Sequence, residues 1–407
     1  MTRQTAPASP TGSAPERLVT PAFVRLAMAD LAYFTAAGVA VYTLPFYVTG
    51  PVGSDVSGAG LAFGAFAVTA LVLRPFAGRL SDTVGRRPLL LGGALLCAVA
   101  LLITAVVQSF ALVVVLRLTL GIAEAAFFVA SFAAVADLAP ASRLGEALSY
   151  NSLGLYLGLS LGPPLGELLV RTVGFTAAWS AAATLASLAA VVVWGMGETG
   201  IRRSEAHPPA RLIHRKALPA SLGFFTSVLA MGGFLAFAAL RADAVGLAST
   251  SMPLFAYGSI VVVGRIVFAK IPDRLPSLPL GAAALAVIAS GMTVIAVCGT
   301  AAGLITGTAL LALGVTFSTP AFFAAVFATA APGEYGAASG TVSAFLDLGL
   351  GGGPILLGLI AASAGLPWTF TVAAAVALAG SLWTLSLARP TVACSSRAPR
   401  APWRRWR

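Results

Sequence analysis

The fold is decided by the stretch Arg74-Pro75-Phe76-Ala77-Gly78-Arg79-Leu80-Ser81-Asp82-Thr83-Val84-Gly85-Arg86-Arg87-Pro88. This polar segment lies between two long apolar runs, and it holds four arginines in a chain with only 10% charged residues. A weaker copy lies downstream, where Arg265 stands 191 positions after Arg74 and Asp273 stands 191 positions after Asp82. Its position predicts that the chain repeats itself.

The same offset relates a second pair of segments. Gly158 and Gly162 map onto Gly349 and Gly353, and a proline follows the second glycine in each segment. Several matches at one ungapped offset indicate two halves that descend from one ancestral unit.

The composition predicts a membrane protein. With 58% hydrophobic residues over 407 positions and a mean hydropathy of +0.93, the chain is too apolar for a water-soluble surface. Apolar runs long enough to cross a hydrocarbon core of ~30 Å fill most of the chain. Helices satisfy the backbone in lipid, and the ~10-residue alternation of barrel strands is missing from the sequence.

We therefore expect an all-α membrane protein with twelve transmembrane helices in two pseudo-symmetric six-helix bundles. The expected spans are roughly 22–49, 57–77, 89–108, 111–136, 146–170, 175–197, 219–241, 250–270, 278–298, 301–328, 336–363 and 366–388. The predicted parts are a disordered tail (1–20), a first bundle (21–198), a linker (199–218), a second bundle (219–388) and a basic tail (389–407).

The distribution of positive charge predicts the orientation. With a cytoplasmic N-terminus, twenty Lys and Arg residues fall in cytoplasmic segments, and only Arg171 and Arg241 fall in outer loops. This bias predicts a multi-pass protein of the inner or plasma membrane with both termini in the cytoplasm. Topology and anionic lipid then account for the net charge of +11, and no nucleic-acid partner is expected.

At this point the motifs resemble those of a known family. Gly78-x-Leu80-x-Asp82-x-x-Gly85-Arg86-Arg87 is similar to the cytoplasmic loop motif of the major facilitator superfamily. Arg117-x-x-x-Gly121 resembles a second motif of that superfamily. Gly158-x-x-x-Gly162-Pro163-x-x-Gly166 resembles the motif of its drug:proton antiporters, although Ser149 occupies the position of that motif's first glycine. The resemblance covers residues ~22–388 and implies secondary transport by alternating access.

The loop motif also has a direct physical interpretation. Glycines permit a tight turn between two helices, and Asp82 can cap a helix or pair with an arginine. A contact of this kind that forms in one conformation and breaks in another acts as a latch. We assign this role to Gly78, Asp82, Gly85, Arg86 and Arg87, with Asp273 and Arg274 in the second half; the alternative is that the arginines only anchor topology.

The antiporter-type motif predicts close helix packing. Gly158, Gly162 and Gly166 recur every four residues and so share one face of a helix, and Pro163 can bend that helix. We expect this helix at the interface between the halves, where rocking occurs, with static packing as the alternative.

Charged residues are rare at membrane depth, and each needs a cavity or a partner. They are Asp30, Arg74, Arg117, Glu124, Arg265 and Asp347, with Glu167 near a helix end. Arg74 and Arg265 are interpreted as snorkelling to the membrane surface. Arg117 and Glu124 lie roughly 10 Å apart along one helix and so need other partners. Asp30, Arg117, Glu124 and Asp347 are the candidate proton-coupling residues, with structural ion pairs as the alternative.

The predicted function is proton-coupled efflux of small lipophilic or amphipathic compounds of the drug or antibiotic type. The expected substrate cavity is aromatic: Tyr33, Phe34, Tyr42, Phe127, Phe128, Phe234, Phe237, Phe322 and Phe323. The expected partners are a small-molecule substrate, protons and the lipid bilayer, and the expected state is a monomer. No phosphate-binding glycine loop, enzyme motif, cofactor site or metal-ligand spacing is found. The alternatives are a transporter of a hydrophilic metabolite such as a sugar or amino acid, and a non-transporting membrane sensor.

Overall fold

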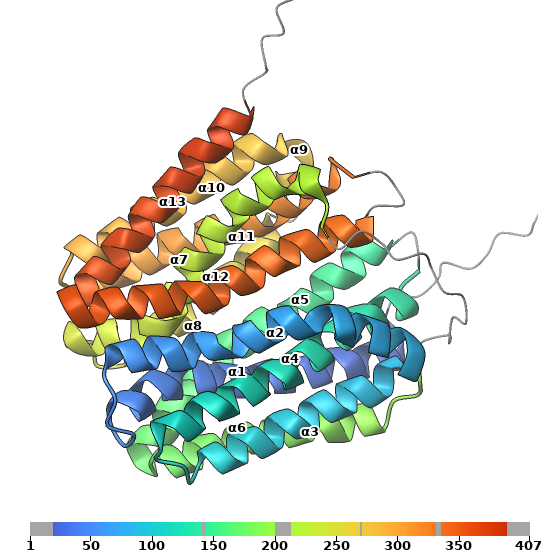
Figure 1. Cartoon of the computed structure of the whole chain (residues 1–407), viewed down its shortest axis with the longest axis horizontal. Helices are drawn as coiled ribbons and strands as arrows, with labels where there is room; N and C mark the ends of the chain where they lie inside the picture. The colour runs from blue at the N-terminus through green and yellow to red at the C-terminus, as the bar shows by residue number, and fades with distance from the viewer. Residues whose placement is uncertain (1–18, 141–142, 200–212, 269–270, 331–334, 389–407) are drawn as a thin grey trace, which may run out of the picture.

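The computed structural model describes residues 19–140, 143–199, 213–268, 271–330 and 335–388. Within these ranges all regular structure is helical (Figure 1). Nearly all of both predicted tails and most of the linker lie outside the described residues.

Twelve long helices follow in order. They are α1 (Pro21–Thr49), α2 (Val56–Val84), α3 (Arg86–Thr104), α4 (Phe110–Leu138), α5 (Leu144–Thr172), α6 (Phe175–Trp194), α7 (Leu218–Ala244), α8 (Met252–Val267), α10 (Ser277–Val297), α11 (Ala301–Phe327), α12 (Tyr335–Ala364) and α13 (Leu366–Ala388). Two short elements, η2 (Arg215–Ala217) and α9 (Ile271–Arg274), lie between them. The twelve predicted spans are therefore present as helices.

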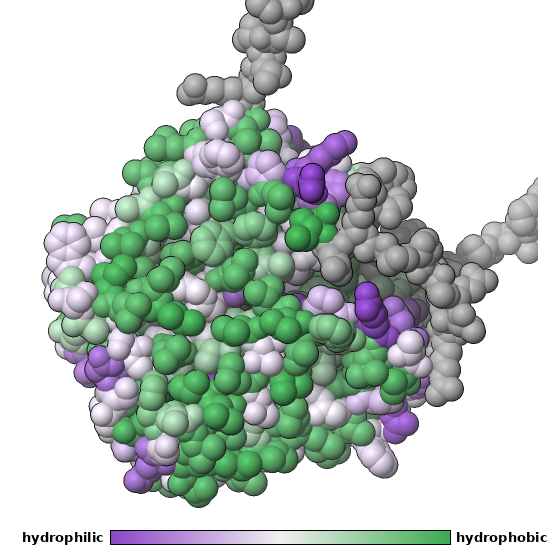
Figure 2. All heavy atoms as spheres, viewed as in Figure 1, coloured by the Kyte–Doolittle hydropathy of each residue, from purple (hydrophilic) through white to green (hydrophobic). Residues whose placement is uncertain are grey.

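The lengths and surfaces of these helices suit a bilayer. Eleven of them are long and apolar enough to cross a membrane, and α8 is a shorter apolar helix of 16 residues. Figure 2 shows hydrophobic residues covering the side of the bundle, with hydrophilic residues gathered toward its ends. Several helices begin at a polar cap, as where Asp55 accepts a hydrogen bond from the backbone N–H of Gly58 (2.8 Å).

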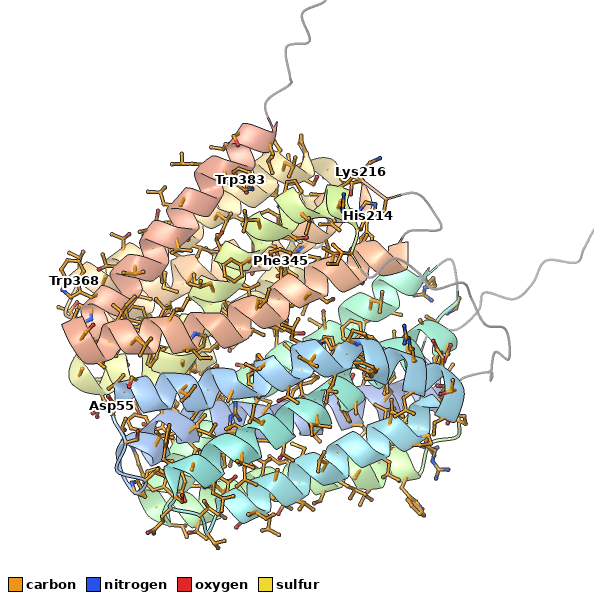
Figure 3. All side chains as sticks on the ribbon, viewed as in Figure 1. Asp55, His214, Lys216, Phe345, Trp368 and Trp383 are labelled. Carbon is orange, nitrogen blue, oxygen red and sulfur yellow. The ribbon has the colours of Figure 1, made fainter. Side chains whose placement is uncertain are left out.

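The two ends of the bundle can be named by the residues they carry. Figure 3 shows Asp55 and Trp368 at one end and His214 and Lys216 at the other. The end with His214 and Lys216 also carries Gly85, and is called the motif end below. The end with Asp55 and Trp368 is called the opposite end.

The repeat is visible in the packing. Helices α1–α6 form one bundle, and α7, α8 and α10–α13 form the other (Figure 1). Gly162 of α5 packs so closely on α1 that an added Cβ would lie 2.5 Å from the backbone of Gly38. Gly353 of α12 packs in the same way on Leu229 of α7. Positions related by the 191-residue offset therefore occupy equivalent places.

The halves meet through two helix pairs. Gly60 and Gly64 of α2 lie against Gly351, Pro354 and Gly358 of α12. In the second pair, α8 lies against α5, and the hydroxyls of Ser160 and Ser259 are 2.8 Å apart. Small residues allow the backbones to approach at both places.

Two sequence-based expectations about glycines need correction. The polar segment is not a loop from Gly78 onward, because α2 continues to Val84 and places Gly78 inside a helix. Only Gly85 turns the chain, with φ +118°. The helix that carries Gly158, Gly162 and Gly166 does lie at the interface between the halves, where α5 packs on α8, but its glycine stripe faces α1 of its own half.

Candidate functional site: a central cavity with a charged cluster

A cavity of about 2120 Å³ lies between the two halves. Its lining comes from α1, α2, α3, α4 and α5 on one side and from α7, α8, α11 and α12 on the other. It reaches the exposed residues Arg79, Asp82 and Thr83 at the motif end, and so opens there. Apolar and aromatic side chains form most of its wall, and a small number of charged groups converge inside.

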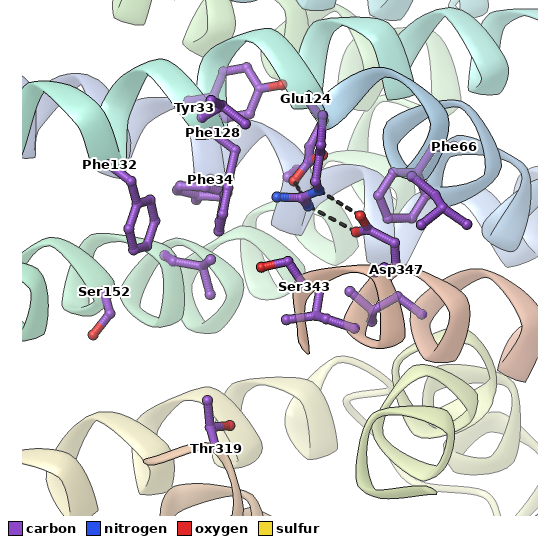
Figure 4. A pocket seen from close by; sticks show the side chains of 18 of the residues that line it. Tyr33, Phe34, Phe66, Glu124, Phe128, Phe132, Ser152, Thr319, Ser343 and Asp347 are labelled. Atoms are coloured by element: carbon purple, nitrogen blue, oxygen red, sulfur yellow. Dashed lines mark hydrogen bonds and ion pairs between the residues drawn. The ribbon is translucent and has the colours of Figure 1, made fainter. Parts of the chain in front are cut away.

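The charged groups form a cluster around Arg74. Its Nε lies 2.6 Å from Oδ2 of Asp347, and its Nη2 donates to Oδ1 of the same carboxylate at 2.9 Å. Nη2 also donates to both carboxylate oxygens of Glu124, at 3.1 and 3.3 Å. Figure 4 shows Glu124 and Asp347 meeting at this point of the cavity, with dashed lines marking the ion pairs.

This cluster joins the two halves, because Arg74 and Glu124 belong to α2 and α4 and Asp347 belongs to α12. The side chain of Asp347 is 1% exposed and that of Arg74 is 12% exposed. The aromatic ring of Phe128 covers the guanidinium group at 4.5 Å. The interpretation of Arg74 as a snorkelling residue is therefore wrong.

A second arginine, Arg265 of α8, lines the same cavity. Its Nη2 donates to the hydroxyl of Tyr156 at 3.1 Å, and its guanidinium lies 4.5 Å from the centre of that ring. Its Nη1 is 3.4 Å from the hydroxyl oxygen of Ser152. Tyr156 and Ser152 belong to α5, so Arg265 also connects the halves.

Arg117 has neutral partners. It donates from Nε to the carbonyl oxygen of Ala62 (3.0 Å) and from Nη2 to that of Phe63 (3.3 Å), and it lies over the ring of Phe66. Arg117 lines the cavity, but its hydrogen bonds go to backbone carbonyl groups of α2 and not to a carboxylate.

Asp30 lies apart from the cavity. Both of its carboxylate oxygens accept from the hydroxyl of Ser131, at 2.9 and 2.8 Å, and Asn151 donates to that hydroxyl oxygen. Asp30 is completely buried among α1, α4 and α5 of the first half. The structure thus brings Glu124 and Asp347 together and keeps Asp30 separate.

The expected aromatic lining is present in part. Tyr33, Phe34, Phe128 and Phe323 line the cavity. The other expected aromatic residues lie outside its lining: Tyr42, Phe127, Phe234, Phe237 and Phe322. Phe127 stacks on Tyr33, and Tyr42 bonds to Thr250 at the opposite end. Further aromatic residues of the lining that the sequence analysis missed are Phe63, Phe66, Phe132, Tyr156, Tyr257 and Phe327.

At the motif end, Arg86 holds three helices of the first half together. It pairs with Asp82 of α2 (2.8 Å) and with Asp137 of α4 (3.0 Å), while its own backbone begins α3. The carboxylate of Glu198, just after α6, accepts from the backbone N–H groups of Arg86 and Arg87 at 2.8 and 3.3 Å. Asp82 therefore pairs with a neighbouring arginine, which was one of the two roles considered for it.

The remaining latch residues are placed as follows. Arg87 donates to the carbonyl oxygen of Trp194 at 2.6 Å and lies over its ring. Asp273 and Arg274 end α9 at the corresponding place in the second half, and the side chain of Asp273 lies outside the described part.

At the opposite end Glu167, predicted from the sequence only as a charge near a helix end, bridges the two halves. This α5 residue accepts from the backbone N–H groups of Thr250 (2.8 Å) and Ser251 (3.0 Å) at the start of α8. It also accepts from the hydroxyl of Ser249 at 2.7 Å and pairs with Arg171 at 2.9 Å. A carboxylate at a helix N-terminus is a favourable arrangement, and here it joins the two halves.

Among the residues that the structure describes, no three His, Cys, Asp or Glu side chains are grouped so that they could hold a metal ion. Cys97 and Cys298 are free thiols. Cys394 lies outside the described residues.

Comparison with known proteins identifies the family. The family model of the Major Facilitator Superfamily matches residues 26–348. The chain belongs to the Major Facilitator Superfamily. It is therefore a secondary transporter of small molecules that works by alternating access, and it is not an enzyme.

Two relatives of this transporter are described as members of the same superfamily. An uncharacterized transporter of this superfamily from Salmonella typhimurium is 26% identical over 366 residues, covering 88% of this chain and 94% of that one. A relative from Burkholderia mallei, also uncharacterized, is 25% identical over 361 residues, and the match covers 84% of this chain and 86% of the relative.

Solved structures share the fold at low identity. The human organic anion transporter TETRAN has a TM-score of 0.71 at 19% identity, with 91% of this chain and 100% of that chain covered. The nucleoside transporter NupG has a TM-score of 0.73 at 13% identity, with 90% and 100% covered.

Proposed function

We propose that this transporter exports small lipophilic or amphipathic compounds in exchange for protons. The observation that carries the proposal is the Arg74 cluster, because it places two carboxylates and one arginine across the two halves inside the cavity. With both carboxylates ionised, the three groups carry a net charge of −1. One bound proton therefore neutralises the cluster.

The cluster lies where a proton or a substrate can act on the halves. Asp347 is one helical turn from Gly351, which packs on Gly64 of α2. A proton on Asp347 removes the charge that attracts Arg74. A substrate polar group that replaces the carboxylate on Arg74 has the same effect. Either ligand frees α12 from α2 and lets the halves rock, which is the requirement for exchange of one for the other.

The two ends of the bundle supply the two gates. The positive-inside bias favours a cytoplasmic motif end, so the described state is open to the cytoplasm. Closure of the outer end by Glu167 fits that assignment. When the motif end closes, the side chains around Asp82 and Arg86 come within reach of the second half, and the latch role predicted for them belongs to that state.

The composition of the cavity supports amphipathic substrates over sugars or amino acids. Phenylalanines of both halves, including Phe34, Phe128 and Phe323, line it. Among its lining residues, apolar side chains outnumber the nine with hydroxyl groups, and none is an asparagine or glutamine. Apolar walls with a few polar groups at fixed places are typical of sites for amphipathic ligands.

Transport in proteoliposomes tests the proposal. Three probes with one apolar body and a charge that does not change with pH are suitable: 2-naphthalenesulfonate, 2-naphthalenesulfonamide and 2-naphthyltrimethylammonium. We expect an imposed pH gradient to drive at least one of them uphill in the presence of the wild-type protein. Asp243→Asn, an exposed carboxylate at the opposite end, serves as the control variant for Asp347→Asn. Exchange that ignores the pH gradient in the wild type contradicts proton coupling.

A further inference from the structure

The two cavity arginines occupy equivalent positions but have different surroundings. Arg74 corresponds to Arg265 by the 191-residue offset, and by the same offset Asp347 corresponds to Tyr156. Each arginine indeed contacts its corresponding partner across the interface of the halves, Asp347 at 2.6 Å and the Tyr156 hydroxyl at 3.1 Å. The same arginine contact is therefore present in both halves, but its partner is an acid only in the Arg74 contact.

The second acid of the Arg74 cluster is also replaced. Glu124 corresponds to Val315, a buried residue of α11. Arg265 thus contacts a hydroxyphenyl ring where Arg74 contacts a carboxylate, and the position that corresponds to Glu124 carries an aliphatic side chain. In the described part of the chain, no ion pair to Arg265 is formed.

Hydrogen-bond donors near Arg265 remain unused. Its Nε is buried and has no hydrogen-bond partner in the described structure. The hydroxyl of Tyr257, on the same helix and also lining the cavity, is buried without a partner, and Tyr257 is only 1% exposed. By the offset, Tyr257 corresponds to Phe66, so the second half has gained a hydroxyl at this position. Buried donors of this kind are costly unless a ligand or a water satisfies them.

We propose that Arg265, with the hydroxyls of Tyr156 and Tyr257, binds the anionic head group of an amphipathic organic anion. Relative to the Arg74 cluster, the three replacements remove two acids and add two hydroxyl donors, and each change favours an anion. The deep groups of the cavity, Arg74, Arg117 and Arg265 against Glu124 and Asp347, carry one excess positive charge. A carboxylate or sulfonate monoanion neutralises it, while its apolar body lies against the aromatic wall.

The inference rests on the transport function proposed above and narrows its substrate class. An organic cation would have to approach Glu124 and Asp347, which Arg74 already holds at both carboxylates. Displacing that arginine costs a cation two ion pairs, whereas an anion finds Arg265 with a free donor.

Binding of the three naphthalene probes to the purified protein in lipid nanodiscs tests the inference. We expect the sulfonate to bind about tenfold or more tightly than the sulfonamide or the quaternary amine, since only it completes a charge-assisted contact. Arg265→Gln removes that preference, and Arg265→Lys keeps part of it. Tyr156→Asp also removes it, because it restores the counterion that the first copy retains. Arg215→Gln, an equal charge change on the exposed surface of η2, leaves it unchanged.

The outcomes separate this inference from the transport proposal. Unchanged binding of the sulfonamide shows that the Arg265 variants are folded. Equal binding of all three probes, absence of sulfonate binding, or a preference that survives Arg265→Gln overturns the anion site. Uphill transport of the neutral or cationic probe under a pH gradient would leave the exchange function intact in that case.

Discussion

Nε of Arg74 on α2 lies 2.6 Å from Oδ2 of Asp347 on α12, 273 positions away in the chain. This ion pair joins the two halves on the cavity side of the glycine packing between the same two helices. In the exchange proposed above, a proton or a substrate breaks this pair and so acts on a contact between the two halves.

The stability of the cluster depends on its one cation. Arg74→Gln leaves two poorly exposed carboxylates without a counterion, and we expect it to lower the free energy of unfolding by about 3–5 kcal/mol. Adding Glu124→Gln and Asp347→Asn to that variant should recover most of the loss, because no unpaired charge then remains. Thermal unfolding in detergent measures both changes. Equal stability of the single and triple variants would show that the three groups do not form one unit.

The contact between the halves at the opposite end is predicted to depend on Glu167. Glu167→Gln removes the charge that accepts from Ser249, Thr250 and Ser251, and we expect it to shift the population toward a state open at the opposite end. Spin labels on the exposed positions Pro51 and Ala248 report the separation of the halves there. The distance should increase in Glu167→Gln and stay unchanged in Asp243→Asn. A wild-type distance distribution in Glu167→Gln would assign Glu167 to helix capping alone.

Close packing of α5 on α1 predicts a steric effect. A Cβ at Gly162 would lie 2.5 Å from the α1 backbone, so Gly162→Ala should destabilise the protein by about 1–3 kcal/mol through overpacking. Gly352→Ala on α12 is the matched control, because an added Cβ there meets nothing within 4 Å. Melting temperatures of the two variants provide the comparison. Similar values for both would mean that α1 moves aside at little cost.

The latch residue Asp82 should matter for transport more than for stability. Its side chain is 66% exposed, and exposed ion pairs stabilise proteins by less than about 1 kcal/mol. We therefore expect Asp82→Asn to express and melt like the wild type but to transport the probes more slowly. Thr83→Val, an adjacent exposed change, is the control. Wild-type transport by Asp82→Asn would reduce the segment to a topology anchor.

The sequence predicted the helices, the two halves and their equivalence, because the length of each apolar run and the 191-residue repeat can both be read directly from the order of the residues. It did not predict the Arg74 cluster. The apolar run ends near residue 77, which made Arg74 look terminal, but α2 continues to Val84 and buries Arg74 well inside it. Glu124 and Asp347 reach Arg74 only because α4 and α12 pack beside α2, and no local pattern encodes that packing.

One signal for the second cavity arginine was present in the sequence. The offset that pairs Arg74 with Arg265 also pairs Asp347 with Tyr156, so the asymmetry could have been read before the contact was known. The gate at Glu167 gave no comparable signal, because its partners are backbone N–H groups whose positions depend on the packing of α8.

The most direct test follows the separation of the halves at the motif end as pH changes. Spin labels on the exposed positions Ala136 and Ala328, at the ends of α4 and α11, report that separation in lipid without substrate. In the wild type we predict one long distance at alkaline pH, where the Arg74–Asp347 pair is intact, and a second, shorter distance on acidification. Asp347→Asn should show both distances at every pH, because its neutral side chain resembles the protonated carboxyl and cannot form the ion pair with Arg74. If Asp347→Asn responds to pH as the wild type does, the proton acts elsewhere and the cluster is not the coupling site.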